Sequence, residues 1–86
     1  MKLYGWVLRG SQRRMILQCL NRPKSPTLIK EETKIKFSNV SDVLRAMEKV
    51  GVVECLNPSE KMGRLYQLTG TGTKIKRYLE PESKTR

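Results

Sequence analysis

The chain of 86 residues contains no histidine and only two cysteines, Cys19 and Cys55, which lie far apart in the sequence. Neither cysteine belongs to a Cys-x-x-Cys pair or to a Cys/His cluster, so the sequence offers no ligand set for a metal. The acidic residues are scattered, and without histidine no general base stands beside a nucleophile. We therefore expect no enzyme and no cofactor. We interpret both cysteines as small buried residues in a reducing compartment rather than as a disulfide.

Long hydrophobic runs are also missing. No apolar segment approaches the roughly 20 residues needed to span a bilayer. No segment has the charged start, apolar middle and cleavage site of a signal peptide. We expect a soluble, cytoplasmic protein with no membrane partner. Its length fits one domain over residues 1–80, followed by a disordered tail at 81–86.

Negative charge is scarce. Eight Asp and Glu residues stand against eighteen Lys and Arg residues, which gives a formal net charge of +10 at pH 7. The excess is largest in residues 1–37, which carry nine basic and two acidic groups. Such a surface attracts polyanions, and nucleic acid is the expected one because membrane signals are missing.

Apolar residues recur at helical spacing in five segments of the chain. The first segment also suits a strand because it holds aromatic and β-branched residues, but we favour a helix that ends at Gly10. The predicted helices span residues 2–9, 11–21, 26–33, 37–50 and 70–80.

Start and stop signals support these boundaries. Ser25 is a favourable N-cap with Pro26 at the first helical position, Gly51 is a favourable stop, and Thr69 caps the last helix. The residues expected to face the core are Met15, Ile16, Cys19, Leu20, Leu28, Ile29, Val40, Val43, Leu44, Met47, Ile75, Tyr78 and Leu79.

Residues 52–56 and 64–68 have the composition of strands, and the turn-rich segment 57–63 between them predicts a β-hairpin with a seven-residue loop. A three-helix core, a hairpin wing and a C-terminal helix make an α+β, mostly helical, winged helix-turn-helix domain. In this arrangement the helix at 37–50 fits the major groove of double-stranded DNA, and the hairpin at 52–68 reaches over the adjacent backbone.

The stretch from Leu28 to Thr69 resembles the core of MarR-like and ArsR-like winged-helix regulators. The run from Val40 to Glu54 is similar to their recognition helix entering the wing. Residues 66–69 with Gly72 resemble their Y-x-L-T-x-x-G exit, and residues 13–17 resemble their R-x-x-I-L helix. The lone cysteines differ from ArsR-type metal sensors, and the short chain differs from the longer MarR-type proteins with a ligand pocket. The resemblance is closer to minimal archaeal regulators.

This resemblance implies a DNA-binding transcriptional regulator that acts as a homodimer. The alternative is another non-enzymatic module with the same fold, because fold alone does not determine function. Such a module is a nucleoid-associated or RNA-binding winged helix, or a protein-interaction subunit of the transcription machinery.

Candidate base contacts lie on the side of the helix at 37–50 that is opposite its apolar face. Asn39 suits an adenine edge and Arg45 suits guanine or phosphate, whereas Phe37 is expected to pack in the core rather than wedge into DNA. Alternatively, the polar residues at the helix start only cap and solvate it. The candidates are Lys36, Ser38, Asn39, Ser41, Asp42 and Arg45.

Basic residues elsewhere are candidates for phosphate contacts. Lys61 and Arg64 flank the hairpin tip and are expected to touch phosphates or the minor groove, unless they are ordinary charged residues of a tip. The other candidates, each of which is alternatively part of a solvated face, are Arg13, Arg14, Arg22, Lys24, Lys30 and Lys34.

The two ends of the chain carry more apolar residues than a small core needs, and such a surplus often marks an interface. The alternative is that Trp6 and Tyr78 complete the core of one copy. The predicted dimer interface comprises Leu3, Tyr4, Trp6, Val7, Ile75, Tyr78 and Leu79.

Overall fold

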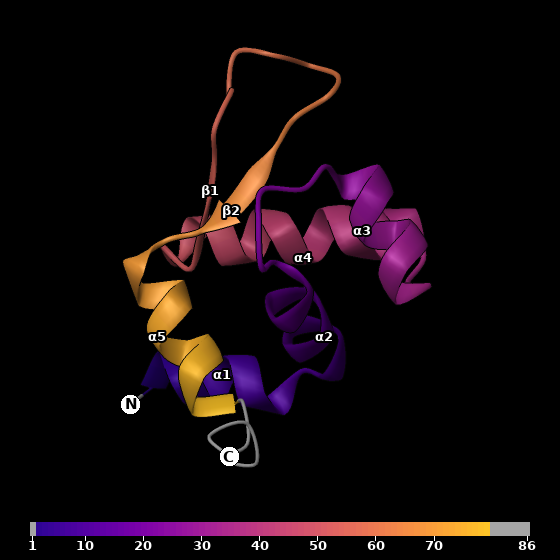
Figure 1. Cartoon of the computed structure of the whole chain (residues 1–86). Coiled ribbons are helices and arrows are strands. Elements are labelled where there is room, and N and C mark those ends of the chain that lie inside the picture. The colour runs from indigo at the N-terminus through magenta and orange to yellow at the C-terminus, as the bar shows by residue number, and fades with distance from the viewer. Residues whose placement is uncertain (1, 80–86) are drawn as a thin grey trace.

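A computed structural model of the protein describes residues 2–79. Its elements, in order, are α1 (Lys2–Arg9), α2 (Ser11–Cys19), α3 (Pro26–Thr33), α4 (Phe37–Lys49), β1 (Val53–Cys55), β2 (Tyr66–Leu68) and α5 (Gly70–Leu79) (Figure 1). This order confirms the predicted winged helix-turn-helix arrangement. The predicted tail at 81–86 and the predicted domain end at residue 80 lie outside the described residues.

One hydrophobic core joins the helices to the base of the hairpin. Helix α2 packs against α1, α3, α4 and α5. The fully buried face of α4 consists of Val40, Leu44 and Met47, as predicted, with Val43 only partly buried beside it. The predicted inward face of α2 is wrong at Met15, which is exposed, whereas Leu17 is fully buried. The stripe that faces the core is therefore Ile16, Leu17 and Leu20.

Helix ends follow the local signals of the sequence. The Ser25 Oγ accepts a hydrogen bond of 3.2 Å from the backbone N–H of Leu28, and Pro26 occupies the first turn of α3. Lys34 ends α3 in the left-handed conformation with φ of 65°, and Gly51 follows α4 with φ of 85°. Helix α2 ends at Cys19, two residues before the predicted end, because Leu20 leaves the helical conformation.

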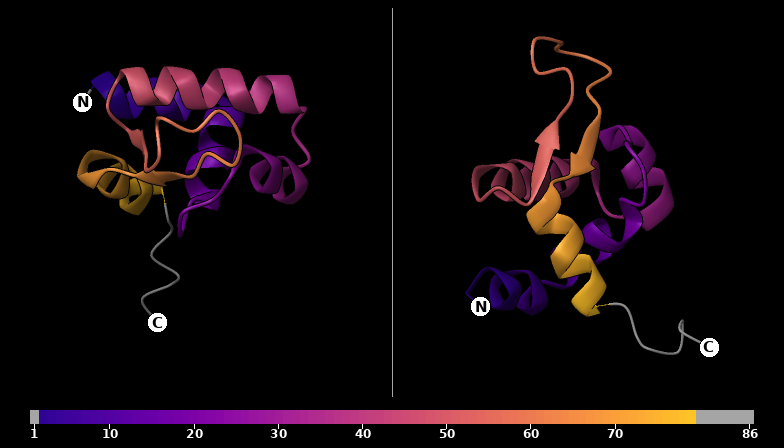
Figure 2. Two further views of the ribbon diagram at one scale, coloured as in Figure 1. Left: turned by 90° about the horizontal axis from the view of Figure 1, so that it is seen from above. Right: turned by 60° about the vertical axis from the view of Figure 1, so that its left-hand side comes forward.

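The hairpin is antiparallel, with Val53 opposite Leu68 and Cys55 opposite Tyr66. Its strands have three residues each and are shorter than predicted, so the connecting loop is longer than seven residues. Side chains hold this loop in shape: the Asn57 Oδ1 accepts from the backbone N–H of Leu65 at 2.9 Å. The hairpin projects from the end of the molecule opposite α1 (Figure 2).

Candidate nucleic-acid interface

A groove of about 550 Å³ lies between the start of α3, one face of α4 and the loop of the hairpin. Helix α4 supplies this face because its opposite side is held in the core. The groove is lined by Ser25, Pro26, Thr27, Phe37, Ser41, Arg45, Glu48, Lys61, Met62, Gly63, Arg64 and Tyr66. Two consecutive helices and the loop of the hairpin thus form one concave surface.

The lining side chains of α4 follow a single stripe. Phe37, Ser41, Arg45 and Glu48 are spaced by four, four and three residues, which places them on one side of the helix. The Arg45 Nη1 donates a hydrogen bond of 3.3 Å to the Asp42 Oδ1, and both side chains are exposed. An exposed pair of this kind adds little stability, but it restricts where the guanidinium points.

Four of the residues predicted to bind DNA, Ser41, Arg45, Lys61 and Arg64, come together in the groove. Lys36, Ser38 and Asp42 are exposed on α4 or at its start but do not line the groove, and Asn39 is half-buried. The contacts predicted for them remain predictions. The predicted contact residues outnumber the α4 residues that line the groove, because the prediction included every polar position opposite the apolar stripe. The hairpin and α3 flank only one edge of that surface.

Arg64 also shapes the hairpin loop. Its Nε donates to the carbonyl oxygen of Glu60 at 2.7 Å, and its Nη2 donates to that of Pro58 at 3.0 Å. A further side-chain hydrogen bond, with Tyr66, raises the pKa of Arg64. A guanidinium has five N–H donors, so those not used in these three bonds remain for an anion. Lys61 and Met62 are exposed at the tip, where the Met62 side chain is 85% exposed.

Several lining residues were not predicted from the sequence. The Ser25-Pro26 signal located the start of α3, but no local pattern indicated that this start faces the groove. A helix N-terminus carries free N–H groups and a partial positive charge, which favour a nearby anion. The prediction that Phe37 packs in the core is wrong, because its side chain is 47% exposed and lines the groove.

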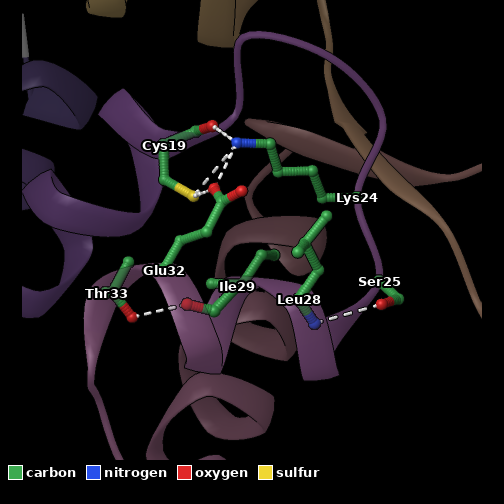
Figure 3. Close-up of polar contacts among 7 residues, drawn as sticks. All are labelled: Cys19, Lys24, Ser25, Leu28, Ile29, Glu32 and Thr33. Atoms are coloured by element: carbon green, nitrogen blue, oxygen red, sulfur yellow. Dashed lines mark hydrogen bonds and ion pairs between the residues drawn. The ribbon is translucent and has the colours of Figure 1, made fainter.

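The predicted phosphate contact of Lys24 is also wrong, because its side chain is 6% exposed and its ammonium group is already paired. The Lys24 Nζ donates to the Cys19 carbonyl oxygen at 2.7 Å and to the Glu32 Oε1 at 2.5 Å (Figure 3). Its backbone pairs with that of Tyr66, which draws the chain before α3 against the sheet. Lys24 therefore joins α2, α3 and β2 from inside the fold.

Glu32, which is exposed, and Cys19, which is half-buried, complete the cluster around the buried Lys24. The hydrogen bond from Lys24 lowers the pKa of Glu32 below its ordinary value, so its carboxylate is charged at neutral pH. Burial raises the pKa of the Cys19 thiol, which donates to the Glu32 Oε1 at 3.3 Å. A protonated thiol is a poor nucleophile and a poor metal ligand. Within residues 2–79, no three His, Cys, Asp or Glu side chains gather in a way that could hold a metal ion.

The remaining basic candidates differ in their surroundings. The Arg13 guanidinium lies 4.1 Å from the centre of the Trp6 ring and donates to the Trp6 carbonyl oxygen at 2.6 Å, so it ties α2 to α1. The Arg13 guanidinium keeps its positive charge in this cation–π contact, but it points toward α1. The exposed candidates, which lie outside the groove lining, are Arg14, Arg22, Lys30 and Lys34.

The predicted dimer interface is wrong at Val7 and Ile75, which are fully buried within one copy and complete its core. Tyr78 is exposed and packs edge-to-face on Tyr4, with ring centroids 5.4 Å apart. Leu3, Trp6 and Leu79 are partly buried against the core. A hollow of about 540 Å³ on this part of the surface is lined by Tyr4, Leu8, Ser11, Arg14, Met15, Gln18, Tyr78 and Leu79.

The three-helix core, the paired strands and the closing helix together define a winged helix-turn-helix domain. Solved structures that share this fold include the reduced form of MarR from E. coli and NadR in complex with 4-hydroxyphenylacetate. Their TM-scores are 0.74 and 0.72, and their sequence identities are 22% and 23%. These likenesses cover 88% and 92% of this chain but 58% and 61% of those proteins, so the chain spans about three fifths of their length.

A mutant MarR from E. coli complexed with operator DNA also shares the fold, with a TM-score of 0.66, 24% identity, and coverage of 88% of this chain and 57% of that one. No protein-family model matches the sequence, and no curated protein sequence is detectably similar to it. None of the helices in the described part of the chain is long and apolar enough to cross a membrane.

Proposed function

We propose that this protein is a DNA-binding transcriptional regulator, without enzymatic activity, that places α4 in the major groove and the hairpin over the flanking backbone. The observation that carries this proposal is the groove in which the α4 stripe, the hairpin tip and the start of α3 meet. With 13 residues, α4 is about 20 Å long, and one helix fits the B-DNA major groove, which is about 12 Å wide.

The chemistry of the lining suits DNA. Arg45 lies in the middle of the stripe, where a guanidinium can donate two hydrogen bonds to the edge of a guanine. Lys61 and Arg64 supply positive charge at the hairpin, and the start of α3 adds the positive end of its helix dipole, which favours a phosphate. The net charge of +10 favours association with a polyanion. The operator-bound mutant of MarR from E. coli provides a precedent for DNA binding by this fold.

The other predicted contacts remain part of the proposal, as flanking contacts around the groove. Lys36 and Ser38 stand exposed at the start of α4, beside Asn39 and Asp42. We assign phosphate contacts to the exposed basic residues Arg14, Arg22, Lys30 and Lys34, and a weaker one to Arg13, whose guanidinium is held on Trp6. The close similarity to minimal archaeal regulators and the cytoplasmic location also remain predictions.

We further propose a homodimer in which the hollow beside α1 and α5 packs against a second copy. Leu8, Met15 and Tyr78 expose apolar surface around this hollow. The hollow adjoins α1, which lies at the end of the molecule opposite the hairpin (Figure 1), so a partner there leaves the hairpin open. A symmetric dimer would present two recognition helices to half-sites about one helical turn apart.

Two substitutions distinguish sequence-specific contacts from non-specific electrostatic binding to DNA. In Arg45→Ala, affinity for the preferred duplex, selected from a random pool, is expected to fall about tenfold or more, with a smaller loss for random duplex. In Lys61→Ala, all duplexes are expected to bind more weakly by a similar factor, and the slope of log K against log salt falls by about one. Fluorescence anisotropy with labelled duplexes measures both effects.

The matched control is Lys49→Ala, which removes an exposed charge from the end of α4 outside the groove lining. Its effect should be small for every duplex. If Arg45→Ala and Lys61→Ala bind all duplexes as the unmodified protein does, the proposed docking is wrong. Equal affinity of the unmodified protein for selected and random duplexes would instead favour a nucleoid-associated role.

The dimer has its own test. Leu8→Glu is expected to convert the protein to monomers and to weaken binding to a two-half-site duplex, because a carboxylate would be buried in the apolar contact. Val50→Glu is the control, since Val50 is also exposed and also lies at the end of a helix but does not line the hollow. Sedimentation equilibrium reports the mass. Equal masses for both variants and the unmodified protein would place the dimer contact elsewhere or exclude it.

A further inference from the structure

We propose that Phe37 is a specificity-determining residue whose ring contacts the C5-methyl group of a thymine in the major groove. This inference rests on the proposed DNA-binding function and extends it to the kind of base that the start of α4 selects. Phe37 is the first residue of α4, its side chain is 47% exposed, and it lines the groove on the same stripe as Ser41 and Arg45.

The surroundings of Phe37 set it apart from the other rings of the chain. Tyr66 is buried, Tyr4 and Tyr78 pack on each other, and Trp6 lies under Arg13. In the described part of the chain Phe37 has no ring partner, and it is not among the residues packed on the core. The ring is therefore accessible from the groove that it lines, where a ligand can contact it.

The chemistry of the major groove indicates which base the Phe37 ring contacts. Thymine is the only base of ordinary DNA that presents an apolar group there, and the aromatic ring of phenylalanine is a suitable partner for that methyl group. The polar side chains farther along the stripe match polar base edges instead. The eight residue steps from Phe37 to Arg45 cover about 12 Å of helix, which corresponds to at most about four base pairs. The thymine is therefore expected within four base pairs of the guanine that Arg45 contacts.

Replacing thymine by deoxyuridine removes only this methyl group and leaves base pairing intact. Each thymine in a half-site of the selected duplex is replaced singly by deoxyuridine. We expect the replacement at one of these positions to lower affinity by about fourfold, which is the effect of losing one contact the size of a methylene group. Phe37→Ala should lower affinity for the thymine duplex and abolish the difference between thymine and deoxyuridine at that position. Phe37→Leu, which keeps an apolar side chain, should retain part of the difference.

This double comparison isolates the contact from any effect of Phe37 on folding, because a merely destabilised variant would still distinguish the two duplexes. Val50→Ala, an exposed apolar residue outside the groove, is expected to preserve the full difference. If no thymine position responds to deoxyuridine, or if Phe37→Ala keeps the response, the inference is overturned while DNA binding itself stands. If no duplex binds at all, the proposed function fails and the inference fails with it.

Discussion

Gly72→Ala is expected to lower the free energy of unfolding by about 3 kcal/mol, a large share of the stability of a small domain. A Cβ atom at this position would lie 2.2 Å from the carbonyl oxygen of Val52, closer than any real contact allows. That same oxygen accepts hydrogen bonds from the backbone N–H of Thr69 at 3.0 Å and from its Oγ1 at 3.1 Å. Moving it apart from α5 would therefore break the connection between the hairpin and the last helix.

Gly70→Ala provides the matched control, because nothing lies within 4 Å of the Cβ position of Gly70 and its φ is ordinary for an L-residue. This change should leave stability unaltered or raise it by about 0.5 kcal/mol, since alanine restricts the unfolded chain. Urea denaturation followed by the fluorescence of Trp6 measures both variants. Equal midpoints for the two substitutions would show that α5 is not seated as tightly on Val52 as the structure indicates.

Lys24→Ala is expected to destabilise the protein by about 2 kcal/mol, because it removes a buried stem together with the hydrogen bonds of the ammonium group. The loss is smaller than for a fully buried pair, since the Glu32 side chain is 38% exposed and can be hydrated. Lys24→Met keeps most of the stem and should recover part of the stability. At temperatures where the variants are folded, both should bind duplex DNA as the unmodified protein does, which a phosphate contact would not allow.

The ion pair also predicts a pH dependence. The pKa of Glu32 is lower in the folded protein than in the unfolded chain, so the unfolded chain takes up the proton first as the pH falls. The stability from this pair is therefore complete above the unfolded pKa and is lost as the pH falls through the folded pKa. Denaturation curves between pH 7 and acidic pH should show that the free energy of unfolding of the unmodified protein falls toward that of Lys24→Met. A constant difference at every pH would mean that the charge pair contributes nothing.

Much of the fold was predictable because its signals are local. The Ser25-Pro26 start, the glycine after α4 and the apolar stripe of α4 each depend on residues a few positions apart. The errors came where a position depends on distant neighbours. Met15 and Leu17 are two positions apart and both apolar, and only the packing of α1, α3, α4 and α5 around α2 decides which of them is buried.

The candidate site shows the same division. Arg45 and Lys61 were predicted from their places on a helix and at a hairpin tip, and both line the groove. The roles of Lys24 and Phe37 were predicted wrongly from their residue types. A lysine is usually exposed and a phenylalanine usually buried, but here the lysine is buried beside Glu32 and the ring is exposed in the groove.

By itself, the sequence determined the order of the elements, their approximate ends and the large positive charge, since these follow from spacing, capping residues and composition. The tertiary structure alone decided which edge of α4 forms a concave surface, which basic side chains are free to meet an anion and where α5 is seated on Val52. The physical reason is that burial and pairing depend on groups brought together from far along the chain, and local patterns carry no information about those groups.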